Sequence, residues 1–265
     1  MNILLCNDDG VYAEGIQALY DALKDIANVT VVAPLQERST TGHTLTLDQP
    51  LRLEKVKENF YGLSGYPADC ALMGIAHVLK EKPDLVISGI NRGANLGQDI
   101  YYSGTVAAAR EAAFRGIAAI SVSTDIDYFA HHKDNIHYKS AANFVRELVL
   151  MGIHKYMGKY DLININVPDL PENEIKGHEI TALGFRFYSE EIKERRDFKD
   201  RPYFWIGGVY KGHCQTDGSD CNAVDKGKIS ITPLNFSVNP TEEVGKLSDL
   251  IDKLLNSGSK GIENT

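Results

Sequence analysis

The tetrapeptide Asn7-Asp8-Asp9-Gly10 directly follows the apolar run Ile3-Leu4-Leu5-Cys6. The run predicts a buried strand, so two adjacent carboxylates stand where that strand ends. In open α/β sheets, ligands bind just outside the carboxyl ends of the strands. The tetrapeptide also suits a plain turn, because Asp bonds nearby backbone and Gly supplies positive φ. Taken alone, the tetrapeptide favours a plain turn over a ligand site, and only residues elsewhere in the sequence can favour the site.

Strand-like and helix-like patterns alternate over the first two thirds of the chain, which predicts an α/β fold with a mostly parallel sheet. The expected strands cover residues 2–6, 29–33, 84–87, 118–122 and 162–167, and the expected helices cover residues 15–26, 68–79, 105–115 and 140–151. Helices on both faces of such a sheet give a three-layer sandwich. The 265 residues suffice for one domain of this kind.

Two segments depart from this alternation. Residues 44–62 alternate with period two around Asp48-Gln49-Pro50, which predicts an inserted β-hairpin. Residues 179–235 contain short strand-like runs, and residues 241–255 have the apolar stripe of an amphipathic helix. We therefore expect a β-rich extension with a C-terminal helix over residues 179–255.

Charge and cysteine content exclude several classes of protein. The net charge of −8 argues against general attraction to duplex nucleic acid or to an anionic membrane. The sequence shows no signal peptide and no apolar stretch that could span a bilayer, so we expect a cytoplasmic protein. Cys6, Cys70, Cys214 and Cys221 form no C-x-x-C pair, which argues against a zinc or thioredoxin-type site.

Three polar clusters follow predicted parallel strands: residues 7–10, 34–43 and 88–97, and the last continues to Ser103-Gly104-Thr105 at a helix start. Each cluster alone could be a surface loop or a helix cap. The strand ends, however, lie along one edge of the sheet, so the three clusters should meet there. Their shared placement favours a functional site over three coincident turns.

The oxygen-bearing residues of these clusters suit a hard cation. Carboxylates of Asp8 and Asp9, the hydroxyl of Ser39 and the amide oxygen of Asn91 form an all-oxygen set. Such a set favours Mg²⁺, Mn²⁺ or Ca²⁺ over zinc. The helix start at Ser103-Gly104-Thr105 offers free N–H groups and a positive dipole end to a phosphate. The combination points to hydrolysis of a phosphate ester by metal-activated water.

Two other classes of function remain open from these residues. One is a non-catalytic nucleotide-binding module, which would explain the phosphate-friendly loops but not the clustered oxygen ligands. The other is a transferase with a nucleotide cofactor. Neither G-x-G-x-x-G after the first strand nor G-x-x-x-x-G-K-[ST] is present, which argues against it.

The chain resembles the SurE survival-protein family of 5′/3′-nucleotidases. The resemblance rests on segments 3–10, 32–39, 65–70, 83–97, 102–106, 164–168 and 230–234, in order over nearly the whole chain. It implies a Rossmann-like core and a divalent-metal-dependent phosphomonoesterase for nucleoside 5′- and 3′-monophosphates, with polyphosphate cleavage in some members. It also implies homodimers or homotetramers, for which the hairpin at 44–62 and the helix at 241–255 would be the arms, and the extension at 179–255 would serve oligomerisation.

The same resemblance assigns roles to single residues. It implies one Mg²⁺ or Mn²⁺ ion per subunit on Asp8, Asp9, Ser39 and Asn91. It also implies a phosphate pocket lined by Asn95, Ser103, Gly104 and Thr105. The chain departs from the family pattern at Leu35-Gln36 and Thr40, none of which is an expected ligand.

The mechanism stays open between two schemes. In one, metal-bound water attacks phosphorus and either Asp8 or Asp9 accepts its proton, with Asp8 favoured because the strand end aims it at the pocket. In the other, an aspartate is the nucleophile and forms an aspartyl-phosphate. His43, the last residue of the second cluster, could touch substrate or hold its loop in place.

Overall fold

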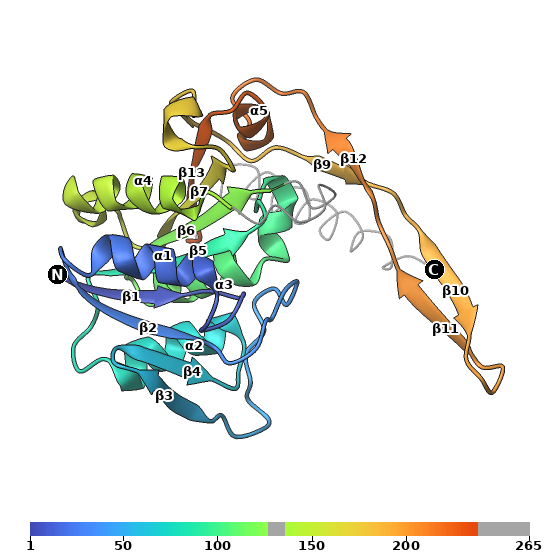
Figure 1. The fold of residues 1–265 in the computed structure, drawn as a ribbon, viewed down its shortest axis with the longest axis horizontal. Coiled ribbons are helices and arrows are strands. Elements are labelled where there is room, and N and C mark those ends of the chain that lie inside the picture. Colours follow the sequence, from blue (N-terminus) through green and yellow to red (C-terminus); the bar gives the residue numbers. More distant parts are fainter. Residues whose placement is uncertain (127–135, 238–265) are drawn as a thin grey trace, which may run out of the picture.

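The centre of the protein is a nine-stranded sheet with strand order β3-β4-β2-β1-β5-β6-β7-β13-β8 (Figure 1). The computed structural model describes residues 1–126 and 136–237. Strands β4, β2, β1, β5, β6 and β7 run parallel, whereas β3 and β13 are antiparallel to their neighbours β4 and β7. The strands are β1 Asn2–Cys6, β2 Asn28–Pro34, β3 Leu53–Lys57, β4 Phe60–Leu63, β5 Leu85–Arg92, β6 Ala118–Asp125, β7 Asp161–Pro168, β8 His178–Ile180 and β13 Ile229–Asn235.

Helices cover both faces of the sheet, as expected for a three-layer α/β/α sandwich. Strand β1 shows the reason. On one face, Ile3 and Leu5 pack under α1 (Glu14–Leu23) and α4 (Tyr138–Leu150). On the other face, Leu4 and Cys6 pack under α2 (Pro67–Met73) and α3 (Gly104–Phe114). Because successive side chains of a strand point to opposite faces, a fully apolar strand must be covered on both sides. The predicted α/β class is confirmed.

Two predicted elements depart most from their predicted bounds. The helix expected over residues 68–79 ends as α2 at Met73 and continues as a π-helical turn, Gly74–Val78. Strand β5 continues to Arg92, five residues beyond its predicted end, so the first half of the third polar cluster lies within the strand. Its pairing with β6 is irregular between Ser88 and Asn91, which marks the point where the backbone turns toward the site.

The hairpin predicted at 44–62 was placed wrongly. Residues 44–47 form no strand, and the hairpin consists of β3 and β4, with β4 joined to the sheet beside β2. The segment before it is held by Asp69 instead: its carboxylate accepts bonds from the backbone N–H (2.8 Å) and the hydroxyl (2.7 Å) of Thr46. Apolar and polar residues thus alternate with period two at 44–47 although this segment pairs with no strand. The hairpin is an edge of the core sheet and not a projecting arm.

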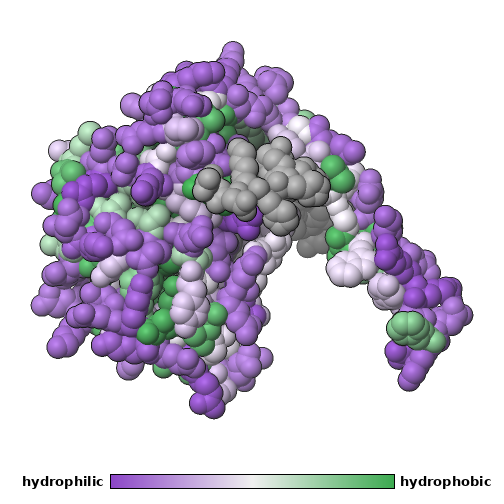
Figure 2. All heavy atoms as spheres, in the orientation of Figure 1, coloured by the Kyte–Doolittle hydropathy of each residue, from purple (hydrophilic) through white to green (hydrophobic). Residues whose placement is uncertain are grey.

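The projecting arm lies between residues 186 and 213. Strands β9 (Arg186–Tyr188) and β12 (Tyr210–His213) pair at its root, and β10 (Ile192–Arg196) and β11 (Pro202–Ile206) pair farther out (Figure 1). Figure 2 shows hydrophobic residues on this arm among hydrophilic ones. Its exposed apolar residues include Ile192, Phe198, Phe204, Trp205 and Ile206. The helix predicted at 241–255 lies outside the described residues.

The contacts of Asp69 predict a stability effect. Its carboxylate also accepts a bond from the backbone N–H of Tyr66 (2.9 Å), so Asp69→Ala leaves several donors without an acceptor. We expect the free energy of unfolding to fall by about 2–3 kcal/mol, measured by urea denaturation. Asp48→Ala, at an exposed carboxylate of the segment that contains Thr46, is the control and should change stability by less than about 0.5 kcal/mol. Equal effects of the two substitutions would contradict this account.

Candidate metal and phosphate site

The turn after β1 is closed by the buried side chain of Asn7. Its Nδ2 donates to the carbonyl of Gly10 (2.9 Å), and its Oδ1 accepts from the N–H of Gly10 (3.2 Å). Gly10 has φ +104°, a conformation that L side chains rarely adopt. Because Asn7 and Gly10 build the turn, the carboxylates of Asp8 and Asp9 are not needed for it and remain available for other partners.

Asp8 is a buried carboxylate, 5% exposed, against the start of α3. Its Oδ1 accepts a hydrogen bond of 2.5 Å from the hydroxyl of Thr105. Burial and, next, the negative charge of Asp9 raise the pKa of Asp8 to about 7, and the bond from Thr105 opposes this rise. A carboxyl held in this way binds a proton in the absence of a cation and loses it readily to one.

Asp9 faces the end of β5. Its Oδ2 accepts from the backbone N–H of Arg92 (3.1 Å). Burial is the main cause that raises the pKa of Asp9; the bond from Arg92 lowers it, and the charge of Glu37 raises it further. Asp9 therefore lies between the turn after β1, the end of β5 and the loop that carries Glu37.

The loop after β2 carries Ser39 and is joined to the first turn through its backbone. The N–H of Arg38 donates to the carbonyl of Asp8 at 2.8 Å. The Ser39 hydroxyl is exposed and donates to Oε1 of Glu37 at 2.6 Å, which leaves its oxygen lone pairs as possible ligands. Sequence reasoning missed Glu37 as the residue that orients Ser39, and its position two residues before a predicted ligand was the available signal.

Asn91 lies near the end of β5, and its amide is oriented by its own chain. Nδ2 donates to the carbonyl of Gly93 at 2.7 Å. A carbonyl cannot pair with another carbonyl, so this contact identifies the nitrogen and leaves Oδ1 as the acceptor atom. That is the atom a hard cation would bind.

The residues predicted to line a phosphate pocket have more specific roles than expected. Ser103 is the N-cap of α3, where its hydroxyl accepts from the N–H of Val106 (3.1 Å). The hydroxyl of Thr105 is directed to Asp8, so this side chain orients a carboxylate. A Cβ on Gly104 would lie 3.0 Å from Oδ2 of Asp8, so glycine keeps this side of the carboxylate open. Of the backbone N–H groups here, that of Gly104 remains suited to an anion, because that of Ser103 donates to the carbonyl of Asp99 (3.2 Å) and that of Thr105 donates to Asp8.

Asn95 is buried and held by the neighbouring strands. Its Nδ2 donates to the hydroxyl of Ser123 (2.8 Å), and its backbone N–H donates to Oδ1 of Asn166 (2.8 Å). Its carbonyl accepts from Nδ2 of both Asn164 (2.9 Å) and Asn166 (3.0 Å). Sequence reasoning did not identify these two asparagines as supports, although buried Asn in a β-strand is unusual enough to signal a polar task.

His43 holds its loop in place. Its Nδ1 accepts from Nε of Arg110 (2.9 Å), and its Nε2 lies 2.9 Å from a carboxylate oxygen of Glu111. Both ring nitrogens are therefore engaged with α3, and the ring also stacks on Phe114. Of the two roles open to His43, the contacts support that of anchoring the loop after β2.

The donor set fits a divalent cation of the oxygen-preferring kind. Two partly desolvated carboxylates lie next to each other in the sequence, and the pKa of each is raised, which a bound cation would reverse. Among residues 1–126 and 136–237, no group of three or more His, Cys, Asp or Glu could hold a metal. A site here therefore needs hydroxyl and amide ligands in addition, as Ser39 and Asn91 can supply.

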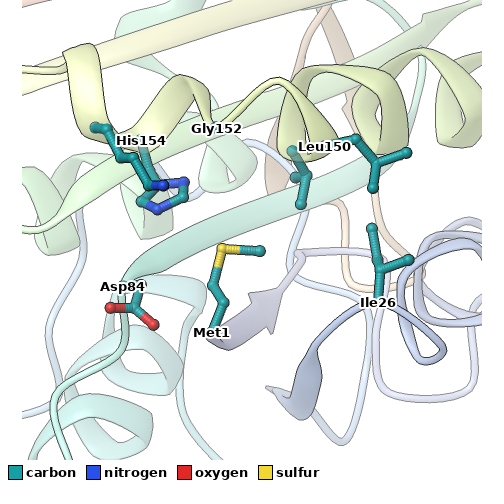
Figure 3. A pocket seen from close by; sticks show the side chains of 8 residues that line it. Met1, Ile26, Asp84, Leu150, Gly152 and His154 are labelled. Atoms are coloured by element: carbon teal, nitrogen blue, oxygen red, sulfur yellow. The ribbon is translucent and has the colours of Figure 1, made fainter.

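Cavities at the opposite edge of the sheet contain none of these residues. One of about 420 Å³ is lined by Met1, Asp84 and His154, among others (Figure 3). Met1 and Asp84 directly precede β1 and β5, so this cavity lies at the amino ends of the strands. Ligand sites of open α/β sheets lie at the carboxyl ends, where Asp8 and Asp9 are found.

The chain is similar to proteins of one family along most of its length. The model of the family "Survival protein SurE" matches residues 3–190. A 5′-nucleotidase SurE of Geobacter sulfurreducens is 45% identical over 238 residues, which cover 90% of this chain and 89% of that protein. A 5′-nucleotidase SurE of Vibrio cholerae is 40% identical over 257 residues, which cover 97% of this chain and 100% of that protein.

A solved structure of the same family is similar to this chain in fold. The crystal structure of the SurE protein from Aquifex aeolicus matches with a TM-score of 0.81 and 36% identity, and the match covers 95% of this chain and 100% of that one. Sequence and fold thus lead to the same group of proteins, and the chain belongs to the SurE family.

Proposed function

We propose that this protein is a metal-dependent 5′-nucleotidase that hydrolyses nucleoside monophosphates to nucleoside and phosphate. It is an enzyme, a phosphoric monoester hydrolase, as the names of its relatives indicate. The observation that carries the proposal is the pair of adjacent carboxylates after β1, with Asp8 against the start of α3, Asp9 against the end of β5, and the pKa of each carboxyl raised. A nucleotide-binding module would need the helix start but not two desolvated carboxylates beside it.

Asp8, Asp9, Ser39 and Asn91 would hold one Mg²⁺ or Mn²⁺ ion, which supplies Lewis-acid activation of water and charge neutralisation. Thr105 keeps Asp8 oriented, and Glu37 does the same for Ser39. At the helix start formed by Ser103, Gly104 and Thr105, the N–H of Gly104 would bind the phosphate oxygens together with Asn95, because the N–H of Ser103 bonds to the carbonyl of Asp99 and that of Thr105 to Asp8. Asp8 rather than Asp9 would accept the proton of the attacking water, because Thr105 holds its carboxylate against the start of α3, where the phosphate would bind.

The same pocket would accept nucleoside 3′-monophosphates and the terminal phosphate of short polyphosphates. All of these substrates present a phosphomonoester or terminal phosphoryl group of the same charge and shape. The contacts described above address the phosphate and not the base, so they favour a broad substrate range.

Phosphate release is the direct test of this function. With Mg²⁺ or Mn²⁺ the protein should release phosphate from nucleoside 5′- and 3′-monophosphates, and EDTA should abolish release. Asp8→Asn should lower kcat/KM by at least about a thousandfold, because a metal ligand and proton acceptor is lost. Asp21→Asn, at an exposed carboxylate of α1 paired with Lys24, is the matched control and should keep full activity.

Two outcomes would contradict the proposal in different ways. No release with any metal would favour a nucleotide-binding module. A covalent phosphate analogue found on Asp8 or Asp9 by peptide mass mapping would replace attack by water with the aspartyl-phosphate scheme.

The raised pKa of Asp8 predicts how pH acts on the metal-free protein. The folded protein keeps the proton of Asp8 up to about pH 7, because its pKa is raised, whereas the unfolded chain loses it near the ordinary carboxyl pKa of 3.8. Stability contributed by this group is therefore present at low pH and is lost as pH rises through that window, by about 1.4 kcal/mol per unit of pKa shift. Asp8→Asn should accordingly stabilise the EDTA-treated protein at pH 8 and change little at pH 4.

Thermal unfolding at the two pH values measures this effect. Mn²⁺ should reduce the advantage of Asp8→Asn at pH 8, because the cation stabilises the ionised carboxylate of the wild type. The affinity for Mn²⁺ should rise with pH up to about 7 and level off above it. An affinity independent of pH between 5 and 8 would contradict the role of Asp8 as a ligand.

We propose further that the protein acts in the cytoplasm as a homodimer or homotetramer. Among the described residues every helix is too short or too polar to span a bilayer. The arm between residues 186 and 213, with its exposed aromatic side chains, is the surface that favours self-association, since exposed apolar patches mark interaction sites.

Deleting residues 190–206 tests the role of the arm in assembly. The wild type should have a solution mass that is a multiple of 29.3 kDa, and the deletion should shift it to a smaller assembly. Light scattering after size exclusion measures both. An unchanged mass would show that other surfaces hold the oligomer together.

A further inference from the structure

The segment between Asn95 and Ser103 carries the contacts that join the pocket to the arm. It contains η2 (Gly97–Tyr101), whose Gln98 makes two bonds with the backbone of Arg186, the first residue of β9. Nε2 of Gln98 donates to the carbonyl (2.7 Å), and its Oε1 accepts from the N–H (2.8 Å). A side chain that satisfies both backbone groups of one residue fixes that residue as a strand partner would.

A charged contact reinforces this junction. Nη1 of Arg186 lies 2.7 Å from Oδ2 of Asp99, and the side chains are only 17% and 21% exposed. The hydroxyl of Tyr188 donates to the same carboxylate. The Arg186 guanidinium also lies over the rings of Tyr188 and Tyr210, 5.5 and 4.4 Å from their centroids. Partial desolvation makes such an ion pair more sensitive to the loss of one partner than an exposed pair is.

Asp220, the first residue of α5 (Asp220–Asp225), makes the third connection. It is fully buried, and its carboxylate accepts from the N–H groups of Gly97 (2.8 Å), Gly184 (2.7 Å) and Cys221 (2.8 Å). Gly97 and Gly184 touch directly: a Cβ on Gly97 would lie 2.8 Å from the carbonyl oxygen of Gly184, and its φ is +54°. One carboxylate thus holds the segment after Asn95 against the segment that leads into the arm.

We infer that Gln98, Asp99 and Asp220 are positioning residues that join the root of the arm to the phosphate pocket, so that the placement of the arm sets the geometry of Asn95 and Ser103. The inference rests on the proposed function for its catalytic consequence. The carbonyl of Asp99 accepts a bond from the N–H of Ser103 (3.2 Å), and the N–H of Gly97 is held by Asp220 two residues after Asn95, so a shift of η2 acts on the backbone next to both pocket residues. Neither Gln98 nor Asp99 needs to touch substrate.

The polar contacts between η2 and β9 support a coupling of the arm to the pocket, and not merely packing of the two segments against each other. Its contacts are directional hydrogen bonds and an ion pair, which hold only one relative arrangement of η2 and β9. An apolar contact would tolerate small sliding of the arm with little change in energy. A second protomer that engages the arm would therefore act on the pocket through β9 and η2.

Kinetics of single variants test the inference. Gln98→Ala and Asp99→Asn should raise KM for a nucleoside 5′-monophosphate by about tenfold at saturating Mn²⁺, with kcat changed by less than about threefold, because phosphate binding is impaired more than the chemical step. Asp197→Asn is the matched control: it breaks an ion pair of equal length with Arg201 (2.7 Å) on the outer part of the arm. The control should leave KM unchanged.

Hydrogen exchange gives a readout that does not depend on activity. In Gln98→Ala and Asp99→Asn, amides of residues 96–106 should exchange faster than in the wild type, and in Asp197→Asn they should not. Asp220→Asn is a stronger perturbation of a buried group, and Gln98→Ala keeps the test valid should that variant fail to fold.

The outcomes separate this inference from the proposed function. A wild type without phosphatase activity would refute the function, and the exchange experiment would still decide the coupling. Unchanged KM and unchanged exchange in both Gln98→Ala and Asp99→Asn would overturn the inference. Equal changes in Asp197→Asn would also overturn it, because the effect would then be a general consequence of altering the arm.

Discussion

The burial of the Asp8 carboxylate beside Asp9 is the constraint on which the rest of the site depends. Burial and the neighbouring charge raise the pKa of Asp8, and the hydroxyl of Thr105 holds the carboxylate against the start of α3. Asn7 and Gly10 close the turn without either aspartate, so both remain available. Two neighbouring carboxylates with raised pKa values destabilise the protein when no cation is bound. Such a pair is expected in a protein that binds a cation, since active sites commonly give up stability for function.

The central sheet brings distant segments to this carboxylate pair. Parallel strands β1, β2 and β5 end at the same edge, and backbone bonds from Arg38 to Asp8 and from Arg92 to Asp9 join their loops. The side chain of His43 secures the second loop to α3. Main-chain hydrogen bonds thus hold the loops that carry the site residues. Because such bonds do not depend on side chains, neighbouring positions such as Leu35-Gln36 can differ in sequence.

Support of the pocket extends well beyond the residues that would touch substrate. Asn164 and Asn166, buried in β7, hold the backbone of Asn95, and Asp220 holds the next turn of the same segment. The contacts of Gln98 and Asp99 with Arg186 continue this support to the arm. Self-association through the arm and phosphate binding in the pocket would then be linked by a short polar path, and the assembly state would be a determinant of activity.

The sequence alone determined the α/β class, the positions of the core strands and helices, and the three strand-end clusters, because apolar periodicity and strand-end polarity are local properties of the chain. It misplaced the hairpin: residues 44–47 alternate like a strand, but Asp69 binds Thr46 and no strand lies beside the segment. Only the tertiary structure decided that the projecting arm is 186–213, that Thr105 serves Asp8, and that Glu37 serves Ser39. Each of these depends on contacts between residues far apart in the chain, or on side-chain direction, and neither is encoded in a local pattern.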